Sequence, residues 1–181
     1  KNNFEKFKDL SNIFHNFEKN LNKLKTKKFL VAVSGGPDSL ALTALTKIYS
    51  LENRKKFYYV LINHNIRANS RSEAKQVKNL LKKFKIKLDI INNTKKITKN
   101  IQGEARKIRY EKLIKFCRKK NINTIITAHN LEDQVETFFI RLSRGRGLHG
   151  LSSMKEIYKI NKNINLVRPL LSFKKKELIE L

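Results

Sequence analysis

The chain has 181 residues, of which 41 are Lys or Arg and 15 are Asp or Glu, so its formal net charge at pH 7 is +26. That length suits one domain with a buried core, which the 40% of hydrophobic residues can fill. Cys117 is the single cysteine, which excludes a disulfide framework and any Cys-x-x-Cys metal or redox site. No apolar run approaches the roughly 20 residues that cross a bilayer, and no signal peptide is recognisable. We therefore predict no membrane partner and a reducing compartment: a bacterial cytoplasm, or the stroma or matrix of an organelle.

The large positive charge has two explanations. Phosphate groups attract Lys and Arg and release counterions when they are bound, so a polyanionic partner would fit. Lysine is also frequent where no function is apparent, as in residues 23–28 and 92–99, which indicates a bias in base composition with lysines on solvated faces. The charge alone therefore does not name the partner.

Apolar patterns of helical and strand-like spacing alternate along the chain. They predict helices at residues 3–24, 40–48, 70–84, 101–119 and 131–142, and strands at 29–33, 57–62, 86–91 and 122–127. Beyond residue 150 the pattern weakens to one strand near 164–167 and a helix that starts after Ser172. Strands that alternate with helices predict a Rossmann-like α/β fold, an open parallel sheet of four to five strands with helices on both faces.

We predict three parts along the chain: an N-terminal helix at 1–26, a central α/β domain at 27–150 and an extension at 151–181. The chain begins at Lys1 without Met and ends at Leu181 inside an apparent helix. We therefore expect a fragment that lacks a C-terminal region.

A loop with two glycines separates the first predicted strand from the helix that follows. Its residues are Ser34, Gly35, Gly36, Pro37, Asp38 and Ser39. Open parallel sheets bind ligands at the carboxyl ends of their strands, and glycines let the backbone approach a ligand closely. Proline suits the first helical position, and the free amides there form an anion site together with the serine hydroxyls. The loop predicts a phosphate site, although it lacks the lysine of a Walker A motif and the glycine spacing of a dinucleotide fingerprint.

Asp38 would repel a phosphate unless a divalent cation bridged the two, so its place in this loop indicates Mg²⁺. The alternative is a plain turn in which the acid favours the N-terminus of the helix. Because the whole Ser-Gly-Gly-x-Asp-Ser pattern follows an apolar strand directly, we favour the phosphate site.

His64 and Arg67 follow the second predicted strand, in the segment Ile-Asn-His-Asn-Ile-Arg at residues 62–67. Beside the phosphate loop they could contact a nucleotide. Alternatively, Ser70 caps the next helix and His64 only orders the turn. Both interpretations stay open.

Arg106 and Arg109 lie three residues apart in Ala-Arg-Lys-Ile-Arg-Tyr, residues 105–110, so they share one face of a helix. A guanidinium fork suits phosphate oxygens, and neutralised charge at the α-phosphate would favour attack there. The alternative is an exposed basic helix, which is common in so lysine-rich a chain. Because arginines stand out against that background, we favour function for Arg109.

His129 and Asp133 lie where the fourth predicted strand meets its helix, in Thr-Ala-His-Asn-Leu-Glu-Asp at residues 127–133. Asp133 could complete a Mg²⁺ site with Asp38. A capping box between Asn130 and Asp133 explains the acid equally well. His129 has no such structural explanation.

Arginines and glycines gather where that helix ends, in Arg-Leu-Ser-Arg-Gly-Arg-Gly-Leu-His-Gly-Leu at residues 141–151. The candidate contacts to RNA are Arg141, Arg144, Gly145, Arg146 and Gly147. Glycines allow close approach of the backbone, and arginines bind phosphate and stack on bases. A helix that ends at glycine with cations near its C-terminus would explain two of the arginines but not the repeated glycines. Arg168, in Arg-Pro-Leu-Leu at 168–171, is a further candidate contact to substrate.

Together these segments, from about Lys27 to Leu171, resemble the PP-loop ATP pyrophosphatases and, within them, the tRNA(Ile)-lysidine synthetase family. This chain has Asn65 where the family usually has glycine, and Glu132 where it usually has a first aspartate before Asp133. The resemblance implies an adenine nucleotide alpha-hydrolase-like fold and a ligase that forms a carbon–nitrogen bond. Such an enzyme uses ATP to adenylate the wobble cytidine of tRNA(Ile) with the CAU anticodon. L-lysine then attacks the activated C2 carbon to give lysidine, with AMP and pyrophosphate as products.

On this basis we predict that the domain at 27–150 binds ATP, at residues 34–39, and that the extension at 151–181 lies on the substrate side. The predicted catalytic residues are Asp38, Asp133, Arg109 and His129, with the two aspartates as ligands of Mg²⁺. Contacts to tRNA or substrate are predicted for His64, Arg67, Arg106, Arg141, Arg144, Gly145, Arg146, Gly147 and Arg168. The family often forms dimers, so a homodimer is an open alternative to a monomer.

Other functions could use similar motifs. A PP-loop tRNA 2-thiolation enzyme would adenylate its substrate in the same way, but such enzymes typically bring cysteines or an iron–sulfur cluster, and Cys117 stands alone within a predicted helix. A GMP synthetase-like amidotransferase has no purpose for the basic Gly-Arg loop. A non-catalytic nucleotide- or RNA-binding module would not need Asp38, His129 and Asp133 together.

Overall fold

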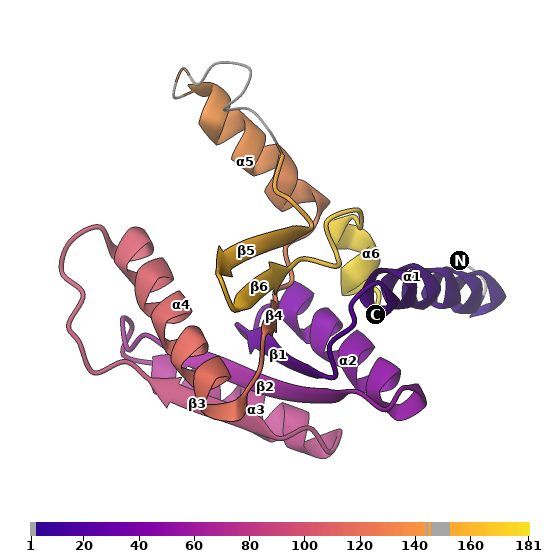
Figure 1. The fold of residues 1–181 in the computed structure, drawn as a ribbon, viewed down its shortest axis with the longest axis horizontal. Helices are drawn as coiled ribbons and strands as arrows, with labels where there is room; N and C mark the ends of the chain where they lie inside the picture. The colour runs from indigo at the N-terminus through magenta and orange to yellow at the C-terminus, as the bar shows by residue number, and fades with distance from the viewer. Residues whose placement is uncertain (1–2, 144, 146–152) are drawn as a thin grey trace.

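The computed structural model describes residues 3–143, 145 and 153–181. Within these residues six strands form one sheet in the order β3-β2-β1-β4-β6-β5, in which every neighbouring pair is parallel except β5 and β6 (Figure 1). The strands are β1 (Lys28–Val33), β2 (Lys56–Asn63), β3 (Leu88–Asn92), β4 (Thr124–Ile126), β5 (Ile157–Asn161) and β6 (Ile164–Val167). The helices are α1 (Asn3–Asn22), α2 (Pro37–Glu52), α3 (Ser70–Lys83), α4 (Ile101–Lys120), α5 (Leu131–Ser143) and α6 (Lys175–Ile179). The predicted α/β class with a mostly parallel sheet is confirmed.

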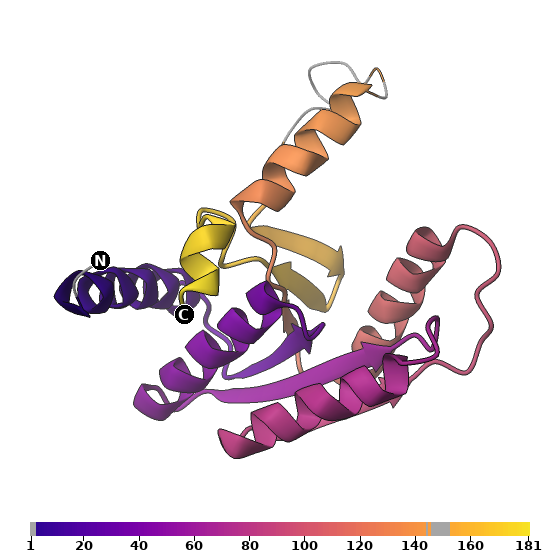
Figure 2. The same ribbon diagram turned by 180° about the vertical axis from the view of Figure 1, so that it is seen from behind.

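Alternate residues of β1 point to opposite faces of the sheet and fill two cores. Phe29 and Val31 pack with side chains of α1, α2, α3 and α6, whereas Leu30 packs with α4. On α4 this second core takes Leu113 and Cys117, which are both fully buried. Figure 2 shows the sheet from the side of α2 and α3. Helices therefore cover both faces, as the continuous apolar runs of the strands predict.

The sheet has one strand more than the four to five expected, and that strand is β5. Its sequence, Ile-Tyr-Lys-Ile-Asn, is exposed or half-buried throughout because β5 forms an edge of the sheet. Its pairing with β6 also shifts register between Lys159 and Asn161. Neither an apolar run nor a clean alternation therefore marks β5 in the sequence. The division of the chain into parts at residues 26 and 150 stays a prediction.

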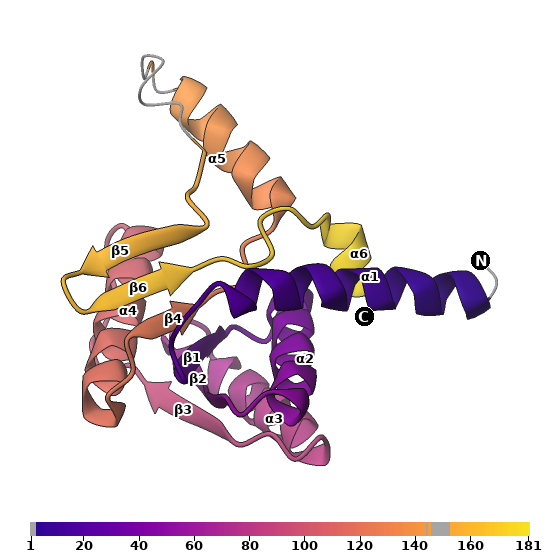
Figure 3. The ribbon, with the colours of Figure 1, turned by 45° about the vertical axis from the view of Figure 1, so that its right-hand side comes forward.

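Helix α5 projects away from the sheet in all three ribbon views (Figures 1, 2 and 3). None of its side chains is buried, and the exposed fractions of Val135, Phe138, Phe139 and Leu142 run from 42% to 60%. The other helices pack on the sheet or on one another, and α1 buries Phe17 completely. In the part of the chain that the structure describes, no helix is long and apolar enough to span a membrane.

Candidate active site

The carboxyl ends of β1, β2 and β4 meet at one edge of the sheet, where a cavity of about 370 Å³ opens. Four separate sequence motifs contribute to its lining. The polar lining residues are Ser34, Gly36, Asp38 and Ser39 after β1, His64 after β2, Arg109 and Tyr110 on α4, and Thr127, His129 and Asp133 after β4. Parallel strands bring the loops at their carboxyl ends to one edge, so the sheet itself assembles this site.

The hydroxyl of Ser39 holds the phosphate loop in shape. Its oxygen accepts hydrogen bonds from the backbone amides of Ser34 (3.2 Å) and Gly35 (3.0 Å), and the hydroxyl donates to the carbonyl of Gly36 (2.9 Å). Ser39 is 4% exposed, whereas Ser34 is exposed. Of the two serines, Ser34 therefore has the hydroxyl that is open to a ligand. Pro37 is the first residue of α2, as predicted.

The two glycines of this loop differ in how well the structure would tolerate a side chain in their place. Gly35 has φ +88°, and a Cβ there would lie 2.8 Å from Cγ2 of Val77, whereas a Cβ on Gly36 would be 3.7 Å from the nearest atom, Oγ of Ser34. We expect Gly35→Ala to lower the free energy of unfolding by about 1–2 kcal/mol, because of this φ and the contact with Val77. Gly36→Ala is the matched control and should cost far less. Equal urea midpoints for the two variants would contradict this loop conformation.

Asp38 presents a carboxylate oxygen that lacks a partner. Oδ1 is buried, and no described residue donates a hydrogen bond to it. Such an oxygen costs free energy unless a ligand completes it. Mg²⁺ binds through one or two carboxylates, waters and substrate phosphates rather than in an all-protein cage. Among the described residues no cluster of three His, Cys, Asp or Glu could hold a metal alone, so Asp38 fits Mg²⁺ best in company with a nucleotide phosphate.

Asp133 and Asn130 form a reciprocal capping box at the start of α5. The amide of Asn130 donates to Oδ2 of Asp133 (2.9 Å), and the amide of Asp133 donates to Oδ1 of Asn130 (3.0 Å). The capping interpretation is therefore correct for Oδ2. Because Asp133 also lines the cavity, a role for its other oxygen towards Mg²⁺ stays a prediction.

His129 is held as a neutral ring beside the cavity. Its Nδ1 lies 2.9 Å from Oγ1 of Thr127, a hydrogen bond between the two side chains. Burial, and then the positive charge of Arg168, lower the pKa of His129 to about 4, although Asp133 opposes the shift. Near pH 7 the imidazole is uncharged, so it can donate or accept a hydrogen bond but cannot supply a positive charge.

Arg109 lines the cavity with a side chain that is exposed as a whole, while neighbouring atoms partly desolvate its guanidinium and so lower the pKa of Arg109. Arg106 lies beside it on α4 and places its guanidinium 5.2 Å from the ring centroid of Tyr110, a cation–π contact. His64 also lines the cavity, with both ring nitrogens buried and without a partner among the described residues. Burial, and then the charge of Arg109, lower the pKa of His64. A cation and unpaired ring nitrogens together suit an anionic ligand.

Arg67 lies outside this cavity, in a neighbouring hollow of about 560 Å³. The two share Ser34, Gly36, Ile62 and His64. Asn65, in the same loop, has φ +54° and donates from Nδ2 to the carbonyl of Asn93 (2.7 Å). Asn tolerates this left-handed conformation better than other non-glycine residues. The loop therefore keeps a conformation that glycine would also adopt.

Arg168 is 6% exposed and follows β6. One guanidinium nitrogen, Nη1, donates to the carbonyl of Lys155 (2.7 Å), while Nε is buried without a partner in the described part of the chain. Arg168 does not line the cavity, but its positive charge lowers the pKa of His129, which does.

The predicted RNA contacts at the end of α5 lie away from the cavity. Arg141 lies in the last turn of α5 and Gly145 follows the helix, and neither residue lines the cavity. The predicted contacts Arg144, Arg146 and Gly147 lie outside the described residues.

Glu132 has a structural role that its motif does not predict. Its Oε2 accepts a hydrogen bond from the backbone amide of Lys175 (2.8 Å) at the start of α6, and the amide of Leu131 donates to the carbonyl of Phe173 (3.0 Å). The segment before α6 thus anchors the first turn of α5, next to the catalytic candidates His129 and Asp133. Thr127 and Tyr110 also line the cavity, although neither was predicted as a site residue. The sequence offers a single indication of their role, which is that each lies within a motif that contains a predicted site residue.

The PP-loop domain family matches residues 9–181 of this chain. The fold and the glycine loop at the end of β1 agree with that match, so the class is an ATP-utilising α/β domain with a phosphate-binding loop. The chain belongs to the PP-loop family.

Within that family, the curated relatives described here are tRNA(Ile)-lysidine synthases. The one from Orientia tsutsugamushi (strain Boryong) is 40% identical over 168 residues, which cover 92% of this chain and 38% of that protein. The one from Wolbachia pipientis wMel is 40% identical over 151 residues, which cover 82% and 35%. The one from Rickettsia rickettsii (strain Sheila Smith) is 35% identical over 177 residues, which cover 93% and 36%. The chain thus spans little more than a third of the length of these relatives.

Two solved structures share the fold. The U34-tRNA thiolase NcsA from Methanococcus maripaludis, with its [4Fe-4S] cluster, has a TM-score of 0.78 at 18% identity and covers 94% of this chain and 62% of its own. The NH3-dependent NAD synthetase from Campylobacter jejuni has a TM-score of 0.56 at 17% identity and covers 96% and 70%. At such identities the likeness concerns the fold alone.

Proposed function

We propose that this chain is the catalytic part of a tRNA(Ile)-lysidine synthetase, which adenylates the wobble cytidine of tRNA(Ile) and then joins it to L-lysine. The observation that carries the proposal is the cavity at the carboxyl edge of the sheet, where loop 34–39 meets His64, Arg109, His129 and Asp133. Relatives named as tRNA(Ile)-lysidine synthases, 34% to 40% identical over most of this chain, support it.

The proposed roles follow from these positions. The amides at the start of α2 and the hydroxyl of Ser34 would bind the phosphates of ATP, because the amides of Ser34 and Gly35 already donate to Ser39. Asp38 would hold Mg²⁺ with help from Asp133. When bound, Mg²⁺ would neutralise charge on the departing pyrophosphate. Arg109 neutralises the α-phosphate, and neutral His129 positions a reactant through a hydrogen bond.

The reaction then has two displacements. The C2 oxygen of cytidine attacks the α-phosphorus, and pyrophosphate leaves. An amine of free lysine attacks C2, the amine loses a proton, and AMP leaves with the former C2 oxygen. Arg67, Arg106, Arg141, Arg144 and Arg146 would contact the RNA, whereas Arg168, which is 6% exposed, would act on the site through His129. A homodimer stays a prediction.

The decisive test is the identity of the group that enters the tRNA. With ATP and tRNA(Ile), we expect radiolabelled lysine to enter the tRNA and AMP to be released in equal amount. Cys117→Ala should keep this activity, because the thiol is fully buried and burial raises the pKa of Cys117 to about 12. A thiol of that kind is not a sulfur carrier. The variant should lose only about 1 kcal/mol of stability.

Other outcomes lead to other functions. Entry of cysteine-derived sulfur, or AMP formation without lysine incorporation, would favour a tRNA thiolation enzyme. No AMP formation with or without tRNA would favour a nucleotide- or RNA-binding module without catalysis.

A further inference from the structure

The turns that lead into the parallel strands are strongly basic, and they lie at the edge of the sheet opposite the ATP cavity. Residues 25–28, 54–56, 85–87 and 118–120 precede or begin β1, β2, β3 and β4. Among these thirteen residues eleven are Lys or Arg, and none is Asp or Glu. We call these four segments the basic edge.

Composition and helix dipoles together explain only part of the basic edge. A uniform bias towards lysine would make both edges of the sheet alike, yet the loops at the carboxyl edge include Asp38, Glu132 and Asp133. Cations near a helix C-terminus are favourable, which explains residues 118–120 at the end of α4. Residues 54–56 and 85–87 also follow helix C-termini, those of α2 and α3, so the dipole favours their cations too. Residues 25–28 begin three residues after the end of α1 at Asn22, where the dipole no longer acts.

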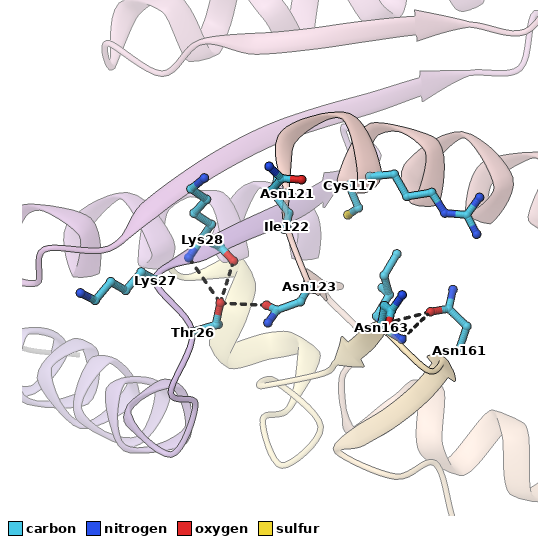
Figure 4. A pocket seen from close by; sticks show the side chains of 11 residues that line it. Thr26, Lys27, Lys28, Cys117, Asn121, Ile122, Asn123, Asn161 and Asn163 are labelled. Carbon is cyan, nitrogen blue, oxygen red and sulfur yellow. Dashed lines mark hydrogen bonds between the residues drawn. The ribbon is translucent and has the colours of Figure 1, made fainter.

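A groove of about 520 Å³ lies between parts of the basic edge and the turn from β5 to β6 (Figure 4). Its polar lining has no carboxylate and consists of Thr26, Lys27, Lys28, Arg118, Asn121, Asn123, Asn161 and Asn163. Thr26 braces it, because its hydroxyl donates to Oδ1 of Asn123 (2.8 Å) and so ties the entry of β1 to the entry of β4. Lysine, arginine and asparagine are donors that bind the phosphates and sugars of nucleic acids.

We propose that the basic edge binds the phosphodiester backbone of the substrate RNA while the reacting nucleotide occupies the cavity at the other edge. This inference rests on the proposed function, because it requires an RNA substrate. The six residues of β1 separate the two edges by about 20 Å, at roughly 3.3 Å per residue. An RNA must therefore extend at least that far from the reacting nucleotide to touch both, and a short oligonucleotide cannot.

The test compares two triple variants of the full-length protein that lose the same charges. The edge variant is Lys27→Gln, Lys28→Gln, Arg118→Gln. The matched control is Arg71→Gln, Lys75→Gln, Lys78→Gln, on the exposed face of α3. All six side chains are exposed, so both variants should fold, which thermal melting checks. The affinities for whole tRNA(Ile) and for a five-nucleotide RNA centred on the target cytidine are then measured at several KCl concentrations.

We expect the edge variant to bind whole tRNA more weakly and to lower the slope of log affinity against log salt by about two, since each lost phosphate contact removes about 0.7–0.9. The control should keep the slope, and all three proteins should bind the short RNA alike. Two results would overturn the proposal: the same salt slope for the edge variant and the unaltered protein, or the same loss of tRNA affinity in the edge variant and the control. In both cases the proposed function would stand as long as the unaltered protein binds tRNA. If the unaltered protein bound no tRNA, the proposed function would fail first.

Discussion

Asp38→Asn is expected to slow the formation of AMP and pyrophosphate by roughly a thousandfold while the protein stays folded. Asn keeps the size of the side chain but removes the charge that would hold Mg²⁺. Loss of such an interaction costs several kcal/mol in the transition state, and about 1.4 kcal/mol corresponds to a factor of ten in rate. The measurement is release of AMP from radiolabelled ATP with saturating tRNA, over a series of Mg²⁺ concentrations.

Glu104→Gln is the matched control for this experiment. Glu104 is also an acid in the first turn of a helix, α4, but it is exposed and lies outside the cavity. Glu104→Gln should release AMP at the rate of the unaltered protein. Thermal melting of both variants checks that the loss of activity in Asp38→Asn does not reflect unfolding. If Asp38→Asn kept the unaltered rate, Asp38 would serve only the helix dipole and the Mg²⁺ assignment would be wrong.

The place of the candidate site could be predicted from the sequence because it depends on local patterns. β1 is buried on both faces and is therefore a continuous apolar run, and the glycine loop follows it directly. The same holds for His64 after β2 and for His129 after β4. Once strands and helices alternate, the carboxyl ends of the strands must share one edge. Convergence of these residues on one cavity then follows without knowledge of any side-chain contact.

Contacts between distant segments could not be predicted in this way. Glu132 looks like one of three acids in a site motif, yet it caps α6 through Lys175, which no local pattern reveals. The neutral state of His129 depends on burial and on Arg168, which comes from another strand end. Ser39 has a hydroxyl that could bind a ligand, but in the structure this hydroxyl accepts hydrogen bonds from the loop backbone and so orders the loop. In each case the tertiary partner decides the role.

Helix α5 shows the limit of periodicity as a guide. The helical spacing of Leu131, Val135, Phe138 and Leu142 correctly predicts a helix, and an apolar face of this kind usually packs against a core. In the structure this face is exposed. Periodicity therefore predicted the element but not its surroundings.

Arg109→Ala is expected to slow adenylation by about a hundredfold to a thousandfold, even with ATP and tRNA saturating. Arg109 lines the cavity, and partial burial lowers its pKa; Tyr110 opposes this shift and the charge of Arg106 adds to it. A partly desolvated guanidinium interacts strongly with an anion, and negative charge on the α-phosphate grows as the C2 oxygen attacks. Removal of one such stabilising donor typically costs that factor in rate. Single-turnover release of pyrophosphate measures it.

Two further variants separate geometry from charge. Arg109→Lys keeps the charge but loses the planar fork that binds two oxygens, so its rate should lie between those of Arg109→Ala and the unaltered protein. Lys107→Ala removes a cation from the same helix, but Lys107 is exposed and outside the cavity, so it should leave the rate unchanged. Equal losses in Arg109→Ala and Lys107→Ala would mean that only the overall field of α4 matters. A loss in Arg109→Ala that disappears at high tRNA concentration would instead assign Arg109 to RNA binding, and the α-phosphate would need another partner.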